Sequence, residues 1–187
     1  MRGRTCEVDD NGERNYLSFQ KKVTSGSPVT DDEIGKIGRE LRGEIDRVFG
    51  HSLAIRELDT GSDNATEIEI ATLTNPFYDA ERFGISFVAS PRHADVLMIT
   101  GAITHNMAIA AQKTYEAMPS PKYVVAVGDD ACTGGIFAGT YAVMGGADKL
   151  FPVDLKIPGN PPSPREILAG LLALMKKADG KQPDQPS

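Results

Sequence analysis

The residues best suited to chemistry fall in three turns, each of which follows a β-rich run of the sequence. Loops at the carboxyl ends of parallel strands gather along one edge of a sheet, so we expect the three turns to converge. Their reactive side chains carry oxygen, apart from a single thiol at Cys132. The sequence therefore predicts an oxygen-rich site at this edge, formed by residues 58–67, 128–132 and 158–162.

Carboxylates are the commonest of these oxygen donors, and two interpretations of them stay open. Hard cations such as magnesium and calcium take oxygen ligands, which would make the edge a metal site. We favour the simpler interpretation that the acids are solvated or stabilise a helix N-terminus, because no spaced calcium-loop signature is present. Nucleotide binding is excluded, because neither a glycine-rich dinucleotide fingerprint nor a P-loop lysine follows the first strand. The acids concerned are Asp63, Glu67, Glu69, Asp129 and Asp130.

The elements that must position these turns alternate between apolar β-rich runs and helical periods. We expect strands at 52–58, 84–88, 94–99, 123–127 and 150–157. We expect helices at 67–73, 80–83, 107–118 and from 164 to about 177, whereas 134–146 is either helix or loop. This alternation predicts a three-layer α/β/α sandwich with a mainly parallel, flavodoxin-like sheet.

An amphipathic helix is expected at 30–50, ahead of the α/β domain at 51–178. Thr30 and Glu33 form a capping box, and Gly50 is a typical stop. Three internal glycines weaken this helix by roughly 1 kcal/mol each, so it needs a surface on its own domain or on a partner. Residues 1–29 are expected to be a flexible arm and residues 179–187 a disordered tail.

Composition limits the classes of function that are open to the chain. Its 187 residues, 40% hydrophobic and 25% charged, are typical of one globular domain. A net charge of -6 argues against nucleic acid as a partner. The sequence contains neither a bilayer-spanning apolar run nor the apolar core of a secretion signal, so a cytoplasmic location is expected. Two cysteines cannot make a disulfide framework or a four-thiolate metal site.

Several longer phrases of the sequence resemble a known family. Between about Gly50 and Lys177 the chain resembles the proximal iron–sulfur electron-transfer subunit of NADH-quinone oxidoreductase (respiratory complex I). It resembles more closely the small subunit of membrane-bound, energy-converting nickel–iron hydrogenases and of formate hydrogenlyase. The phrases that carry the resemblance include Asp59-Thr60-Gly61-Ser62, Glu67-Ile68-Glu69-Ile70, Glu81-Arg82-Phe83-Gly84, Ser90-Pro91-Arg92-His93-Ala94-Asp95, Val125-Ala126-Val127-Gly128-Asp129 and Ile157-Pro158-Gly159.

The resemblance also implies where a cofactor would be held. In that family a 4Fe-4S cluster is bound by a C-x-x-C after the first strand, a cysteine in a V-G-x-C loop and a cysteine in P-G-C-P-P. These ligand positions fall on Asp63, Thr66, Asp130 and Asn160, and none of them is a cysteine. Iron–sulfur clusters need thiolates, and Cys132 lies two residues beyond the matched position. We therefore expect no cofactor.

Because the matched positions lack cysteine, the resemblance implies a cluster-free scaffold subunit without redox activity of its own. It would dock a hydrogenase-like or complex-I-like large subunit and other subunits, touching the cytoplasmic face of a membrane only through them. Two alternatives stay open: a repurposed cavity that binds a hard metal ion or a small ligand, and residual electron transfer through an atypically ligated 4Fe-4S cluster. Candidate cavity or interface residues are Glu67, Cys132, Arg92 and His93.

Overall fold

The computed structural model describes residues 31–178, so the predicted arm, the predicted cap at Thr30 and the predicted tail lie outside the described residues. Its central sheet has five parallel strands in the order β2-β1-β3-β5-β7. Counted along the chain, this order is second, first, third, fourth, fifth, which is the flavodoxin-like order. The predicted fold class is confirmed. The strands are β1 (Leu53–Asp59), β2 (Ile85–Phe87), β3 (Val96–Thr100), β5 (Tyr123–Val127) and β7 (Leu155–Ile157).

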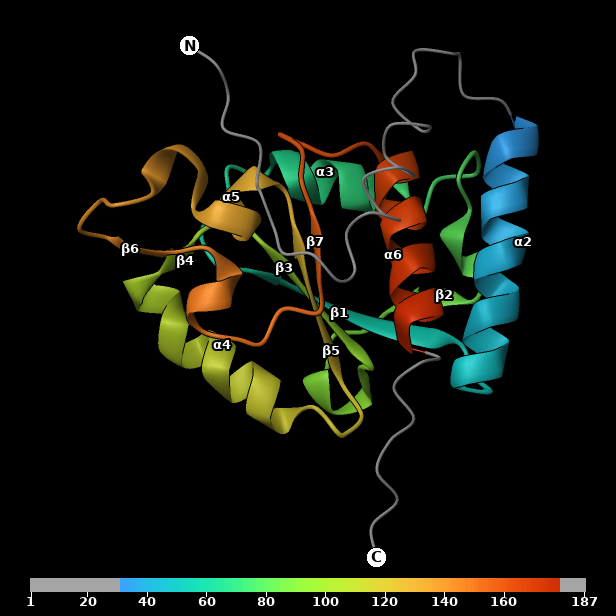
Figure 1. Cartoon of the computed structure of the whole chain (residues 1–187), viewed down its shortest axis with the longest axis horizontal. Helices are drawn as coiled ribbons and strands as arrows, with labels where there is room; N and C mark the ends of the chain where they lie inside the picture. The colour runs from blue at the N-terminus through green and yellow to red at the C-terminus, as the bar shows by residue number, and fades with distance from the viewer. Residues whose placement is uncertain (1–30, 179–187) are drawn as a thin grey trace, which may run out of the picture.

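Helices cover both faces of this sheet (Figure 1). On one face α2 (Asp31–Val48), α3 (Ala65–Thr72) and α6 (Pro164–Ala178) share a hydrophobic core with the strands. On the other face lie α4 (His105–Ala117) and α5 (Asp129–Thr133). Beside them β4 (Ile103–Thr104) pairs antiparallel with β6 (Val143–Gly145). Four short 3₁₀ helices complete the described part: η1 (Ala80–Phe83), η2 (Pro91–His93), η3 (Gly135–Phe137) and η4 (Ala147–Lys149).

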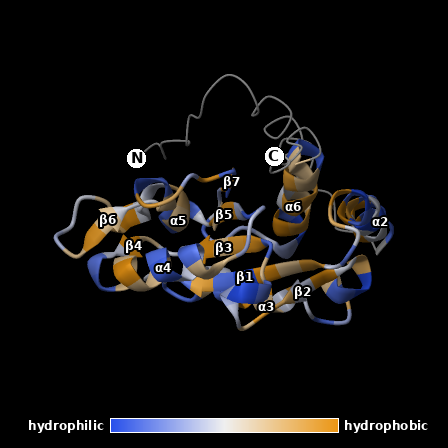
Figure 2. Ribbon diagram, turned by 90° about the horizontal axis from the view of Figure 1, so that it is seen from below, coloured by the Kyte–Doolittle hydropathy of each residue, from blue (hydrophilic) through white to orange (hydrophobic). Residues whose placement is uncertain are grey.

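The central strands are buried on both faces, and hydrophobic residues are accordingly concentrated there (Figure 2). Every residue of β3 and of β5 is buried. Successive side chains of a strand point to opposite faces. Val96 and Met98 therefore join the core beneath α6, whereas Leu97 and Ile99 join the core beneath α4. Continuous apolar runs of this kind are expected only where helices cover a parallel sheet on both sides.

The surface that helix α2 needs lies on its own domain, so no partner is required to cover it. Leu41 and Ile45 are fully buried in the core that α6 shares. An ion pair between Arg165 and Glu33, 3.2 Å from Nη2 to Oε2, joins α6 to α2. The predicted stop is also present: Gly50 has a φ of 68°, the left-handed conformation that favours glycine after a helix.

Three parts of the chain differ from the expectation. The last strand was predicted to begin at Leu150, but it begins at Leu155, because Leu150 ends the η4 turn and Pro152 has no N–H to donate. Residues 129–132 were expected in a turn and form most of α5 instead. The undecided stretch 134–146 contains η3 and β6, and β6 pairs with a strand, β4, that is too short for a periodic pattern to reveal. No helix within residues 31–178 is long and apolar enough to cross a bilayer.

Candidate functional site

The three predicted turns meet at the carboxyl edge of the sheet. The second and third are joined by hydrogen bonds: Asp129 N–H donates to Gly159 O at 2.8 Å, and Gly159 N–H donates to Asp129 Oδ1 at 2.9 Å. The first turn touches the second at Gly128, where an added Cβ would lie 2.8 Å from Thr66 Oγ1. Gly128 also has a φ of 92°, so both its conformation and this close approach require glycine.

The four positions matched to cluster ligands lie on these turns. Thr66 is buried in the first turn of α3, whereas Asp63 is exposed and accepts a hydrogen bond from Ala65 N–H at 3.0 Å. Burial raises the pKa of Asp130, and the nearby carboxylates of Asp63 and Asp129 add to this effect. Asp63 and Asp130 are thus close enough for their charges to interact. Asn160 is exposed directly after Gly159.

The donor atoms at these positions do not fit an iron–sulfur cluster. They are two carboxylates, a hydroxyl and an amide, whereas cluster iron requires thiolate sulfur. Cys132 does not supply one, because its side chain is 1% exposed in the core beneath α4 and its Sγ donates to Ala126 O at 3.6 Å. The structure therefore makes Cys132 a core residue of the sheet face.

A hard-metal site finds no ligand set in the part of the chain that the structure describes. Within residues 31–178 no group of three or more histidine, cysteine, aspartate or glutamate side chains is arranged to hold a metal ion. Glu69 lies farther along α3 and raises the pKa of Tyr78 by its charge, after the larger effect of burial. Several of the acids accept hydrogen bonds from backbone N–H groups instead. Asp59 Oδ1, for example, accepts from Gly61 N–H and from Ser62 N–H, each at 2.8 Å.

Arg92 and His93 are not brought to this edge. Both are exposed in η2, which packs near α4. Asp95, just after them, exchanges hydrogen bonds with Ala54 at the start of β1. The three turns follow the carboxyl ends of β1, β5 and β7, at the opposite edge of the sheet, so the structure separates Arg92 and His93 from the turns.

Glu67 lies in the first turn of α3, and its carboxylate repels that of Glu57 in β1. Both Glu67 carboxylate oxygens are shielded from solvent, and neither has a hydrogen-bond partner. Burial raises the pKa of Glu57, and the Glu67 carboxylate raises it further; Arg56 opposes this and Asp59 adds slightly to it. Two carboxylates that share a poorly solvated space destabilise each other when both are ionised.

Glu57→Gln is expected to stabilise the folded chain at neutral pH. The pKa of Glu57 is raised above its ordinary value of 4.5, so the stability present below pH 4.5 is lost as pH rises through the folded-state pKa. The amide does not ionise, so the variant avoids that loss. Urea unfolding between pH 4 and pH 8 should show the variant's advantage growing with pH. Glu81→Gln, at an exposed carboxylate, controls for the lost charge, and an advantage that did not change with pH would contradict the pairing.

Glu57 was not among the residues expected at the site, although the sequence contains a signal for it. Leu53 and Ile55 mark the buried parity of β1, and Glu57 continues that parity. A charged residue at such a position points toward the core side of the sheet.

A group of arginines on α2 and η1 was not expected either, and periodicity could not have revealed it because the arginines come from elements far apart in the sequence.

A protein family and a known relative both match this chain over most of its α/β domain. Residues 64–174 match the family described as "NADH ubiquinone oxidoreductase, 20 Kd subunit". The chain is 42% identical over 149 residues to formate hydrogenlyase subunit 7 of Escherichia coli (strain K12), and the match covers 78% of this chain. It spans 57% of the length of that relative.

Two solved structures are also similar. A chain of the membrane-bound sulfane sulfur reductase, an archaeal respiratory membrane complex, superposes with a TM-score of 0.64 at 34% identity, covering 78% of this chain and 79% of that one. A chain of an NAD+-reducing nickel–iron hydrogenase superposes with a TM-score of 0.53 at 17% identity, covering 73% and 96%. This second likeness concerns the fold alone.

Proposed function

The chain belongs to the family of the NADH ubiquinone oxidoreductase 20 Kd subunit, and on that premise we propose that it is a cluster-free docking subunit of a multisubunit, membrane-associated complex. In this role it holds a large subunit in place without passing electrons itself. The relatives are subunits of hydrogenase-type or respiratory complexes, which supports partner subunits in general.

The proposal rests on one observation: the three turns keep their backbone arrangement, but the cysteine ligands that the family resemblance implies are missing. The three turns still meet through Gly128, Asp129 and Gly159. Thiolates are absent from all four positions that the family resemblance assigns to cluster ligands. Because iron–sulfur clusters are held by thiolate sulfur and these positions offer hard oxygen donors, the chain would keep the shape of an electron-transfer protein without its electron carrier.

A docking role is supported by how much of the family architecture persists. The likeness to the sulfane sulfur reductase chain covers 79% of that chain, with a TM-score of 0.64. A domain that retains this architecture also retains surfaces on which neighbouring subunits can pack. We place the protein at the cytoplasmic face of the membrane, held there through partner subunits.

The test is co-purification followed by metal analysis. A tagged full-length chain, produced in its native host, is expected to carry the large subunit through affinity and size-exclusion steps. The preparation of the isolated chain is expected to be colourless and to contain well below one iron per chain. Iron and acid-labile sulfide assays and absorption near 400 nm measure this.

Each other outcome would count against a defined part of the proposal. A chain that travels alone would remove the docking role. Iron and sulfide in equal amounts on the isolated chain would support an atypically ligated cluster in its place. Stoichiometric magnesium, calcium or manganese without sulfide would favour a repurposed metal site.

A further inference from the structure

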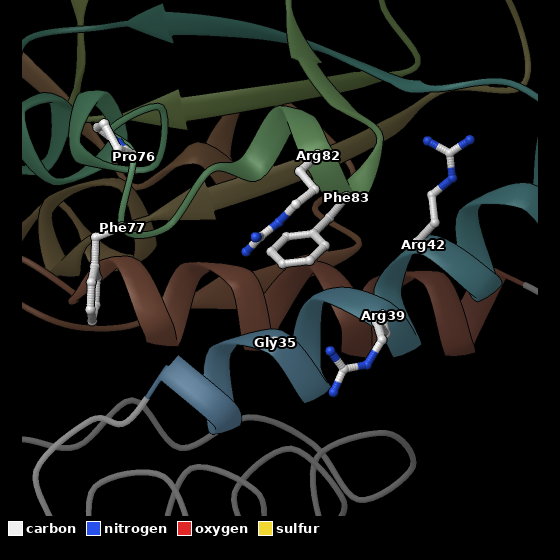
Figure 3. A pocket seen from close by; sticks show the side chains of 7 residues that line it. All are labelled: Gly35, Arg39, Arg42, Pro76, Phe77, Arg82 and Phe83. Atoms are coloured by element: carbon white, nitrogen blue, oxygen red, sulfur yellow. The ribbon is translucent and has the colours of Figure 1, made fainter.

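A cleft of about 600 Å³ lies between α2 and the segment that contains η1 (Figure 3), and none of its lining residues belongs to the three turns. Three arginines line it: Arg39 and Arg42 from α2, and Arg82 from η1. Its apolar wall is made by Pro76 and Phe77, and the Phe77 side chain is 47% exposed. The arginine cleft, as we call it, therefore combines cationic and apolar surface in one hollow.

Two guanidinium groups of the arginine cleft lie against neighbouring groups of its wall. The Arg82 guanidinium carbon lies 4.7 Å from the centroid of the Phe83 ring, a cation–π contact. The Phe83 ring in turn rests on Gly38, where an added Cβ would overlap the ring carbons. The Arg39 guanidinium folds back over Gly35, with Nη1 3.2 Å from the position of an added Cβ. An arginine stacked on a ring, as Arg82 is on Phe83, loses less side-chain entropy when it binds an anion.

The cleft carries more positive charge than its neighbouring acids neutralise. Arg42 pairs with Asp46 at 3.0 Å, and Arg82 pairs with Asp79 at the longer distance of 3.6 Å. Arg39 has no ion pair within the part of the chain that the structure describes. In a chain with a net charge of -6, this local excess is suited to an anionic partner.

We propose that the arginine cleft binds an acidic segment of a partner polypeptide, with carboxylates on Arg39 and Arg82 and an apolar side chain against Phe77. Guanidinium groups bind carboxylates through paired hydrogen bonds. A single phosphate would occupy a small part of this volume and leave Phe77 uncovered, whereas a peptide can present acids and an apolar anchor together. The inference rests on the proposed function for its biological setting, because a docking subunit needs such a surface.

A short synthetic peptide tests the cleft independently of any complex. Acetyl-Glu-Asp-Phe-Asp-Glu-amide is titrated into the full chain by calorimetry, beside its Gln-Asn-Phe-Asn-Gln counterpart. The acidic peptide is expected to bind and to weaken with added salt, and the neutral peptide to show no binding. Arg39→Glu is expected to weaken binding by about tenfold or more, because it removes a charge-assisted contact and adds repulsion. Arg39→Gln should give an intermediate loss.

Lys113→Glu is the matched control, since it makes the same change of charge at an exposed position on α4 across the sheet. Equal weakening by Lys113→Glu and Arg39→Glu would show non-specific attraction and overturn the inference. Inorganic phosphate that competes fully at millimolar concentration would reassign the cleft to a small anion. Binding of vesicles containing anionic lipid, abolished by Arg39→Glu while the peptide fails to bind, would reassign it to a membrane surface.

The same variants separate this inference from the proposed function. If the wild-type chain co-purifies with the large subunit and Arg39→Glu leaves the composition of the complex unchanged, the proposed function stands and the cleft is not the docking site. If no complex forms with the wild-type chain although the acidic peptide binds, the cleft stands and the proposed function fails.

Discussion

Replacing Asp63, Thr66, Asp130 and Asn160 together by cysteine is expected to convert a colourless protein into a brown one. After anaerobic reconstitution the variant should bind about four iron and four sulfide per chain, against almost none for the natural chain. The change in bound iron makes this the largest effect anticipated for any variant of this protein. Iron and sulfide assays, absorption near 400 nm and the electron paramagnetic resonance of the reduced protein measure it.

The physical reason is that the backbone of the three turns is already arranged. The hydrogen bonds between Asp129 and Gly159 join two of the turns, and Gly128 leaves room for the first against Thr66. Only the donor atoms change in the variant, from hard oxygen to soft sulfur. The carboxylate of Asp63 raises the pKa of Asp130, as expected for two positions on the same edge of the sheet.

The quadruple serine variant is the matched control, because it replaces the same side chains by small polar groups without sulfur. It should fold and bind no cluster. A cysteine variant that folds, with circular dichroism like that of the natural chain, and still takes up no iron would show that these positions are not the ligand positions. Cluster uptake by the natural chain would contradict the proposed loss directly.

The architecture of this domain could be predicted because its signals are local. Continuous apolar runs at β3 and β5 indicated strands covered on both faces, and the alternation with helical periods indicated parallel connections. The meeting of the three turns followed from strand direction alone. Which residues lie on those turns was therefore available from the sequence, even though their hydrogen bonds were not.

The parts that could not be predicted depend on contacts between distant segments. Cys132 stood among oxygen-rich residues in the sequence, but α5 turns its Sγ toward β5 and into the core. Arg92 and His93 belong to a family phrase, yet η2 sits by the start of β1. The arginine cleft exists only because α2 packs beside η1, and no period within either element records that contact.

The glycines of α2 illustrate the same limit, and they lead to the largest stability effect that we expect. Helix propensity alone treats Gly38 and Gly43 alike, as a cost to the helix of roughly 1 kcal/mol each relative to alanine. The structure separates them. A Cβ on Gly38 would overlap the buried Phe83 ring, whereas a Cβ on Gly43 would meet nothing within 4 Å.

Gly38→Val is therefore expected to destabilise the protein by about 2–3 kcal/mol, because the ring must move out of a filled core. Gly43→Val should stay within about 0.5 kcal/mol of the natural chain, since glycine and valine differ little in helix propensity. Urea unfolding followed by circular dichroism compares their free energies of unfolding. Thermal unfolding should show a fall in Tm of about 2–4 °C for each kcal/mol lost. Equal effects at the two positions would mean that Phe83 does not rest on α2, and the arginine cleft would then lose the ring that supports Arg82.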